Sequence, residues 1–99
     1  SIPLISSMGT GNKLHPELFR ISDLKDTSVC PLCRVMRKEL KTRGIQSLKV
    51  CWSPEKPLTP APAEEDTGSR RSTPGSISFV PPAAGLMIAG EIVRNICGL

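Results

Sequence analysis

Short apolar runs predict four strands along the chain. The first covers residues 2–7 and leads into a glycine-containing turn over residues 8–12. Further strands are predicted over residues 18–21, 47–53 and 77–80. In the strand over residues 47–53, apolar residues alternate with a lysine and a cysteine, so we expect one buried face and one mixed face.

Residues 31–43 have the spacing of an amphipathic helix. Polar side chains at residues 26–28 are N-cap candidates, Pro31 suits the first turn, and Gly44 suits the position after the last turn. The apolar stripe consists of Leu32, Val35, Met36 and Leu40. The other faces carry Arg34, Arg37, Lys38, Lys41 and Arg43. The pattern therefore predicts a helix with one core face and a basic surface.

The last quarter of the chain contains its most hydrophobic helix candidate. Residues 83–87 include no polar side chain, so we expect this part to be buried on all sides. Isoleucines recur every four residues from Ile88, while polar residues from Glu91 onward gather on another face. The stretch follows Pro81 and is shorter than the ~18–20 apolar residues of a membrane span. We therefore expect a core helix against which the rest of the chain packs.

Residues 53–75 differ in kind from the segments on either side. They contain five of the ten prolines, the acidic cluster at residues 64–66 and the pair Arg70 and Arg71, without hydrophobic periodicity. This composition predicts a long exposed loop. The 99 residues make one small domain, which we divide into residues 1–52, this loop, and residues 76–99. Because the chain opens in an apolar run without Met, we expect a piece cut from a longer protein.

The charge balance is mildly basic, with a net charge of +4 and a pI near 9.1. Ordinary solubility explains this charge, and contact with a polyanion such as RNA is the alternative. Composition alone favours solubility. No signal-peptide pattern is visible, which favours a reducing, cytoplasmic compartment.

Two polar features of the first half are candidates for chemistry. Gly9 and Gly11 follow a predicted strand, as phosphate-binding glycines do, but the third glycine and the following helix are missing. We therefore favour a plain turn. His15 is the only histidine, and no nucleophile or carboxylate partner is evident for it, so we interpret it as a surface loop residue.

The four cysteines leave three interpretations open. Cys30 and Cys33 form a CxxC pair at a predicted helix N-terminus, where a thiolate is stabilised. The pair could be a redox dithiol, half of a zinc site, or two unrelated reduced thiols. Cys51 and Cys97 stand alone, and Cys97 is most simply a small core residue. The spacing favours unrelated thiols, so we assign no metal site.

Four segments together resemble a known protein family. They are IPLISSMGTGNKLHP, SVCPLCRVMRKELKTRGI, SLKVCWSPEKPLTP and PGSISFVPPAAGLMIAGEIVRNI. In this order they resemble the C-terminal half of the ThiF/MoeB/HesA superfamily, and most of all its tRNA threonylcarbamoyladenosine dehydratase branch (TcdA, also called CsdL). The last segment is also similar to a superfamily pattern that would place Gly75, Pro81 or Pro82, Gly85, Ala89 and Glu91 in this chain.

The resemblance implies a fold and an activity. The fold would be the C-terminal part of a Rossmann-like, ATP-binding α/β domain, with a mixed sheet, two main helices and a long crossover loop at residues 53–75. The family binds ATP and Mg²⁺, works as a homodimer and activates a carboxylate by adenylation. In the dehydratase branch this carboxylate belongs to threonylcarbamoyladenosine in tRNA, which then cyclises with loss of water. In the ThiF and MoeB branches it is the C-terminus of a ubiquitin-like sulfur carrier.

The chain departs from the family in what it lacks. The phosphate loop and the residues that act on the triphosphate belong to the N-terminal half, so no catalytic residue is carried over and the fragment is expected to be inactive alone. Cys30 and Cys33 do not match the family's zinc-binding pairs. The crossover loop holds no cysteine, which favours the dehydratase branch over sulfur transfer.

Two sets of residues are candidates for binding. The first set, for a position near the adenylate, is Gly9, Thr10, Gly11 and Asn12. The second set, for tRNA phosphate contact, is Arg34, Arg37, Lys38, Lys41, Lys56, Arg70 and Arg71. Two alternatives stay open: an adenylating activator of a sulfur carrier with sulfur-transfer partners, and a non-catalytic interaction module with metal bound by the four cysteines.

Overall fold

The computed structural model describes residues 3–58 and 75–99 and has a mixed α/β fold. Three strands form one sheet: β1 (Ile5–Ser7), β2 (Arg20–Asp23) and β3 (Lys49–Trp52). The helices are α1 (Pro31–Thr42) and α2 (Pro81–Cys97), with the short 3-10 helices η1 (Pro16–Leu18) and η2 (Leu24–Asp26). The sheet order is β1-β3-β2, with β1 parallel and β2 antiparallel to β3. The predicted mixed sheet with two main helices is confirmed.

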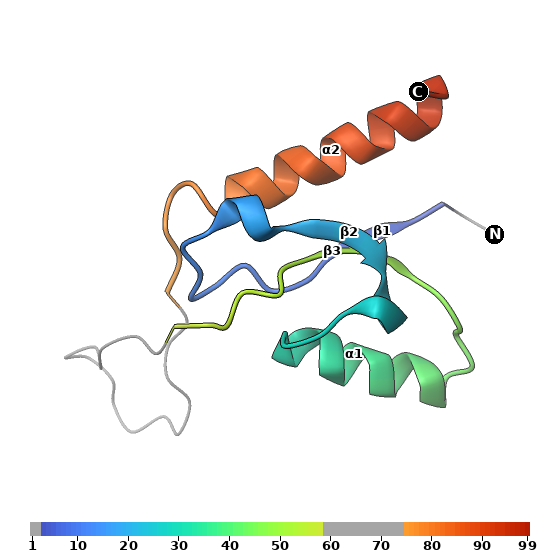
Figure 1. The fold of residues 1–99 in the computed structure, drawn as a ribbon. Coiled ribbons are helices and arrows are strands. Elements are labelled where there is room, and N and C mark those ends of the chain that lie inside the picture. The colour runs from blue at the N-terminus through green and yellow to red at the C-terminus, as the bar shows by residue number, and fades with distance from the viewer. Residues whose placement is uncertain (1–2, 59–74) are drawn as a thin grey trace.

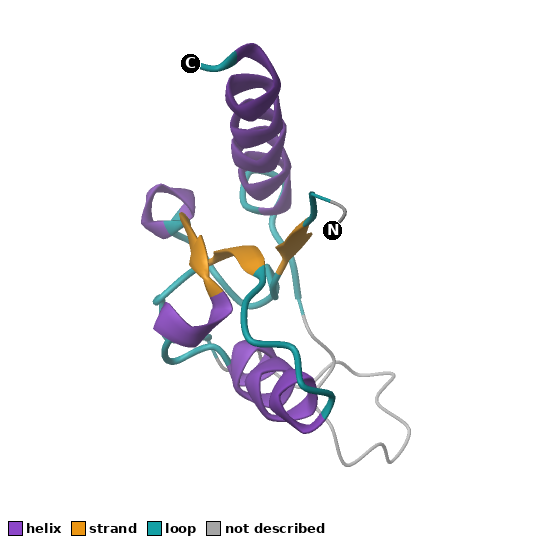
Figure 2. Ribbon diagram, turned by 90° about the vertical axis from the view of Figure 1, so that its right-hand side faces the viewer, coloured by secondary structure: helices purple, strands orange, loops and turns teal. Residues whose placement is uncertain are grey.

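The two main helices cover opposite faces of the sheet, so the molecule has three layers (Figures 1 and 2). Strand β3 lies at the centre, and its side chains alternate between the two faces. Val50 and Trp52 pack into a cluster with Cys33 of α1, whereas Cys51 packs into a second cluster with Ala84 of α2. The mixed face that we predicted for this strand is therefore a second core.

Helix α1 matches its predicted extent but begins differently. Gly44 has a φ of +74° after the last turn, as expected of a glycine in that position. The N-cap is Cys30, whose side chain makes no capping hydrogen bond, so the predicted caps at residues 26–28 are wrong. The reason is a turn at Val29, where φ is +68° and the Cys30 N–H donates to the Ser28 carbonyl over 2.7 Å. This turn separates the polar residues from the helix.

The outer predicted strands need correction. Strand β1 is shorter than residues 2–7, and β2 lies two residues later than predicted because Pro16–Leu18 forms a 3-10 turn first. Residues 77–80 are a turn and not a strand. In this turn the Val80 N–H donates to the Ile77 carbonyl over 3.1 Å, and the side chain of Val80 fills the core beside α2.

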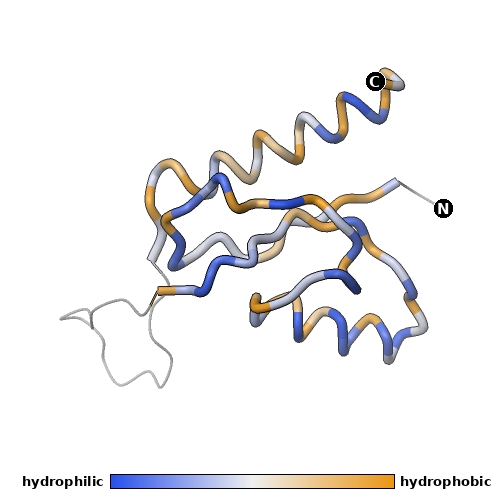
Figure 3. Tube along the Cα trace, viewed as in Figure 1, coloured by the Kyte–Doolittle hydropathy of each residue, from blue (hydrophilic) through white to orange (hydrophobic). Residues whose placement is uncertain are grey.

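Residues 83–87 of α2 are buried on one side only, contrary to our prediction for this part of the helix. Ala84 is its one fully buried residue, and Met87 and Ile88 are half-buried against the sheet. On the other side Leu86 is 74% exposed and Ile96 is 80% exposed. Apolar positions continue along the whole helix in Figure 3, but the sheet covers only one of its faces. Among the described residues, no helix is both long and apolar enough to cross a membrane.

Candidate functional site

The turn after β1 is tied to both ends of the segment that we predicted to be the crossover loop. The Asn12 N–H donates to the Gly75 carbonyl over 2.7 Å, and the Gly75 N–H donates back to Asn12 Oδ1 over 2.8 Å. The Leu58 N–H donates to the Asn12 carbonyl over 2.7 Å. Asn12 has a φ of +59°, a left-handed conformation that Asn tolerates better than most residues. One residue therefore fixes the chain on either side of residues 59–74.

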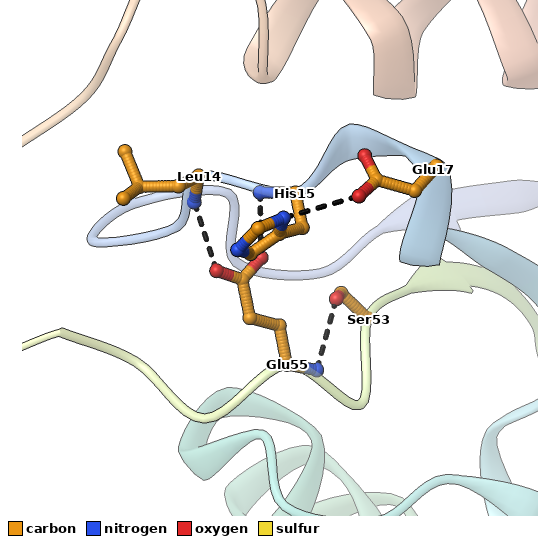
Figure 4. Close-up of polar contacts among 5 residues, drawn as sticks. All are labelled: Leu14, His15, Glu17, Ser53 and Glu55. Carbon is orange, nitrogen blue, oxygen red and sulfur yellow. Dashed lines mark hydrogen bonds and ion pairs between the residues drawn. The ribbon is translucent and has the colours of Figure 1, made fainter.

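The buried carboxylate of Glu55 binds the backbone of the residues that follow the turn after β1 (Figure 4). Glu55 Oε2 accepts from the Leu14 N–H over 2.9 Å, and Glu55 Oε1 accepts from the His15 N–H over 3.0 Å. The Glu55 N–H in turn donates to Ser53 Oγ over 3.0 Å. Because the carboxylate satisfies two backbone donors at once, it fixes the path of the loop. Nothing in the local sequence pattern had pointed to Glu55.

The imidazole of His15 contacts the side chain of Glu17 (Figure 4). Its Nδ1 lies 3.1 Å from Glu17 Oε1, and both side chains are exposed. Hydrogen bonds from the backbone and from His15 lower the pKa of Glu17 below its usual value. A surface ion pair of this kind contributes little to stability. The placement agrees with our interpretation of His15 as a surface loop residue.

The CxxC pair lies beside the turn at residues 9–13. Cys30 and Cys33 are both buried, as is Lys13, whose Nζ donates to the Gly9 carbonyl over 2.9 Å. Burial would by itself raise the pKa of the Cys30 thiol, but hydrogen bonds from the backbone and thiol of Cys33 outweigh it. A hydrogen bond from the Gly9 backbone and the Lys13 ammonium also lower the pKa of Cys30. The net direction is below the ordinary value for a thiol.

The other three thiols lie in different surroundings. Burial, with the neighbouring Cys30, raises the pKa of Cys33 to about 11. Cys51 lies in the core on the α2 side, where burial raises its pKa, and Cys97 is exposed near the end of α2. The four cysteines therefore do not converge on one site. In the part of the chain that the structure describes, no three His, Cys, Asp or Glu side chains gather as metal ligands.

The candidate tRNA-contact residues of α1 form one exposed stripe. Arg34, Lys38 and Lys41 are exposed, and the 3.6-residue period places them on one side of the helix. Arg37 is half-buried, because its guanidinium donates to the carbonyl and hydroxyl of Thr27. Lys56 is exposed in the loop after β3, while Arg70 and Arg71 lie outside the described residues.

A groove adjoins this stripe at the C-terminal end of α1. Its volume is about 510 Å³, and three basic side chains line it: Lys25, Arg37 and Lys41. Asp23 is the one acidic residue of the lining, and its carboxylate accepts from the Lys25 backbone N–H. The sequence pattern had not singled out Lys25, because the residue stands alone in a short 3-10 helix. The groove therefore extends the basic surface of α1 beyond the residues that we predicted.

Comparison with curated proteins confirms the resemblance found in the sequence. The chain is 35% identical over 104 residues to a tRNA threonylcarbamoyladenosine dehydratase of Bacillus subtilis, covering 96% of this chain and 41% of that protein. It is 45% identical over 71 residues to tRNA threonylcarbamoyladenosine dehydratase 2 of Saccharomyces cerevisiae, covering 65% of this chain and 16% of that protein. No protein-family model matches the chain.

Solved structures show the same fold. E. coli TcdA, a tRNA N6-threonylcarbamoyladenosine dehydratase, superposes with a TM-score of 0.80 at 20% identity, covering 97% of this chain and 39% of that one. Its complex with AMP gives a TM-score of 0.77 at 21% identity, covering 98% of this chain and 39% of that one. Its complex with ATP gives 0.61 at 21% identity, with 94% and 40% covered. The chain thus spans about two fifths of the length of these structures and of the B. subtilis relative.

Proposed function

We propose that this chain is the C-terminal part of an ATP-dependent tRNA threonylcarbamoyladenosine dehydratase. The observation that carries the proposal is the match to the B. subtilis dehydratase, at 35% identity over 96% of this chain. The whole protein adenylates the carboxylate of threonylcarbamoyladenosine in tRNA with release of pyrophosphate. Ring closure then expels AMP, which carries away the carboxylate oxygen, so the nucleoside becomes lighter by one water. The names of both curated relatives favour this activity over activation of a sulfur carrier.

The chain supplies the scaffold and not the catalytic groups. Its sheet and its two helices, with the turn at Asn12, form one side of the domain. ATP and Mg²⁺ are bound by the residues of the other part of the protein, where the family's phosphate loop lies. Mg²⁺ neutralises phosphate charge during adenylation. We place no metal ligand on this chain, and the fragment alone is inactive.

The turn at Gly9, Thr10, Gly11 and Asn12 lies near the adenylate in this proposal. Support comes from its position directly after the parallel strand β1, at an edge of the sheet where α/β folds bind ligands. A methyl group added at Gly9 would meet only Lys13 Nζ, at 4.0 Å, so Gly9→Ala leaves the protein itself unstrained. We expect this variant to raise KM for ATP several-fold without changing Tm. An unchanged KM would remove the turn from the nucleotide site.

The basic surface of α1 binds tRNA phosphates in this proposal. Arg34, Lys38 and Lys41 are exposed along the stripe, and the groove adds Lys25. Lys56, Arg70 and Arg71 extend the contact from the crossover loop. Lysine and arginine contacts to phosphate position a nucleic acid without reading its sequence. This surface therefore orients tRNA while another part of the protein selects the modified base.

We further propose a cytoplasmic homodimer, related to the enzymes that activate ubiquitin-like proteins. The outer face of α2 supports the second copy, because Leu86, Val93 and Ile96 form one exposed apolar stripe. Sulfur-transfer proteins are further candidate partners of the whole protein. A direct interaction assay with sulfur-transfer proteins would test that partnership.

A nucleoside assay tests the central proposal. The whole protein is incubated with ATP, Mg²⁺ and tRNA that carries threonylcarbamoyladenosine, and the digested nucleosides are analysed by mass spectrometry. The expected result is the loss of one water from this nucleoside, dependent on ATP. ATP cleavage without dehydration would favour the sulfur-carrier activity instead. The absence of both activities would favour a non-catalytic interaction module.

A further inference from the structure

The groove at the C-terminal end of α1 is formed by three segments that backbone hydrogen bonds hold in place. Gly44, with its φ of +74°, turns the chain back at the end of the helix, and the Ile45 N–H donates to the Leu40 carbonyl over 2.9 Å. In η2 the Leu24 N–H donates to the Leu48 carbonyl over 2.8 Å, which joins η2 to the segment before β3. The backbone around the groove is therefore fixed by the fold.

Large apolar side chains provide part of the lining. They are Leu24, Leu40, Ile45 and Leu48. Leu24 belongs to the buried cluster between α1 and the sheet, and Leu40 and Leu48 pack against that cluster. Ile45 is 47% exposed, so its side chain is open to an occupant. The volume of about 510 Å³ lies within the roughly 300–1,000 Å³ of small-ligand pockets, so the groove can hold an apolar ring system such as a nucleobase.

The charged side chains of the lining favour an anion. Lys25, Arg37 and Lys41 are basic, and Asp23 is acidic, with its carboxylate accepting from the Lys25 backbone N–H over 3.1 Å. Lys41 lies in the last turn of α1, where its charge offsets the negative end of the helix dipole. The Nη1 atom of Arg37 donates to the carbonyl and hydroxyl of Thr27, and its Nε and Nη2 take no part in that contact. A guanidinium held in this way is preorganised to bind a phosphate.

The groove is continuous with the exposed cations of α1. Lys41 belongs both to the lining and to the stripe that it forms with Arg34 and Lys38. A row of cations suits the repeated phosphates of a nucleic acid strand, and an apolar recess beside the row suits the face of a base. In a duplex the faces of the bases are stacked, so only an unpaired base can enter such a recess. The combination favours an unpaired nucleotide over an acidic peptide, because successive phosphates supply charge along the whole row.

We propose that this groove binds one unpaired nucleotide of the tRNA, an inference that rests on the tRNA-modifying function proposed above. The face of the base packs on Leu40 and Ile45, and the three basic side chains of the lining bind its phosphate. Gln46 and Ser47 also line the groove and offer an amide and a hydroxyl to the polar edge of the base. The neighbouring phosphates of the same strand follow the cations of α1. The groove thus holds a looped strand of the tRNA in position.

Binding of labelled tRNA to the whole protein, measured by fluorescence anisotropy, tests the proposal. Ile45→Ser removes an apolar contact with the base and should raise Kd about fivefold. The salt dependence of Kd should stay the same in this variant, because no phosphate contact is lost. Lys25→Gln should also raise Kd, and should make the slope of log K against log salt shallower by roughly 0.7.

Two further variants control for the fold. Ile92→Ser makes the same substitution at an isoleucine that is 42% exposed on α2, on the other side of the sheet, and should leave Kd unchanged. Ile45→Leu keeps an apolar side chain in the groove and should restore the affinity of the parent. A loss in Ile45→Ser that came from damage to the fold would instead appear as a lower Tm and as weaker binding of every RNA.

A fully paired RNA duplex is the second probe. It presents phosphates without an unpaired base, so Lys25→Gln should weaken its binding whereas Ile45→Ser should not. If Ile45→Ser binds tRNA as tightly as the parent does, or weakens tRNA and duplex equally, no base enters the groove and the proposal is wrong. An unchanged affinity in both Ile45→Ser and Lys25→Gln would assign the groove to a partner other than RNA.

These binding measurements need no turnover, so they are independent of the nucleoside assay. A protein that dehydrates the nucleoside but shows no effect of Ile45→Ser would overturn the groove proposal alone. A protein that shows the predicted difference between tRNA and duplex without dehydration would keep the groove as an RNA site and overturn the dehydratase activity.

Discussion

Helices α1 and α2 cover opposite faces of one sheet, but their outer surfaces have opposite character. The outer face of α1 carries the exposed cations Arg34, Lys38 and Lys41. The outer face of α2 carries exposed Leu86 and Ile96 instead. The inner faces differ much less, since each helix contributes apolar side chains to a core. Packing against the sheet therefore explains only the residues on the inner face of each helix. The residues on the outer face depend on what that surface of the protein contacts.

The inner faces give the largest expected effect. Val50 in the α1-side core and Val80 in the α2-side core are both fully buried, so Val→Ala is a matched test of the two. We expect Val50→Ala to lower the free energy of unfolding by about 2–3 kcal/mol, because the central strand cannot relax into the cavity. Val80 lies in a turn before α2, so Val80→Ala should cost about 1–2 kcal/mol. Urea unfolding of the whole protein measures both, and equal losses would contradict this ranking of the cores.

The outer face of α2 is tested by adding a charge to it. Leu86→Glu places a carboxylate in the apolar stripe, and Val35→Glu makes the same change in charge at an exposed position of α1. If α2 contacts a second copy, Leu86→Glu should weaken self-association by roughly tenfold or more, since a buried unpaired charge is costly. Val35→Glu should leave it unchanged. Sedimentation velocity measures both.

The same experiment separates two occupants of the α2 face. A Leu86→Glu variant that stays dimeric but has a lower Tm would place another part of the same protein on α2. A variant with neither change would show that the stripe is free in solution. Either result would contradict the proposed dimer contact.

Charge reversal on α1 gives the next effect. Arg34→Glu combined with Lys38→Glu should weaken tRNA binding by about tenfold at low salt. Each lost phosphate contact also loses the favourable release of counterions from the tRNA. The slope of log K against log salt should become shallower by roughly 0.7–0.9 per contact. Arg94→Glu on α2 is the control, because Arg94 is exposed and its pair with Glu91 is a surface contact. An unchanged salt slope in the double variant would remove α1 from the tRNA surface.

The same contrast explains how much of the fold was predictable from sequence. In α1 the helix period correctly placed Met36 and Leu40 against the core. The other two residues of the predicted stripe, Leu32 and Val35, are exposed, and the fully buried residue of the helix is Cys33.

In α2 no side chain over residues 83–87 is polar, so the helix period carries no information about which face of that part meets the sheet. The prediction of burial on all sides was wrong for that reason. The strand predicted over residues 77–80 was wrong because a short apolar run does not distinguish a strand from a turn that fills a core.

The candidate site was less predictable than the fold, because long-range contacts build it. Asn12 bonds Gly75 across 63 positions of the chain, and Glu55 bonds Leu14 across 41. Nothing in the residues next to Asn12 or Glu55 indicates these partners. The CxxC pair was visible as a motif, but its spacing alone could not reveal the buried Lys13 beside it. Local patterns thus located the pair without giving its surroundings.

The smallest expected effect concerns the ion pair that ties α2 to the central strand. Lys49 Nζ lies 2.9 Å from Glu91 Oε1, and hydrogen bonds from Lys49 and Arg94 lower the pKa of Glu91 below its usual 4.5. A carboxylate with a lowered pKa in the folded state stabilises the fold above its unfolded pKa. This contribution is lost as the pH falls through the lower pKa of the folded state.

Glu91→Gln should therefore reduce Tm slightly at pH 7 and progressively less as the solution is acidified below pH 4.5. Glu39→Gln, which makes the same substitution at an exposed carboxylate of α1, is the matched control. A Tm difference for Glu91→Gln that stays constant into acid would mean that Glu91 stabilises α2 through packing and not through its charge.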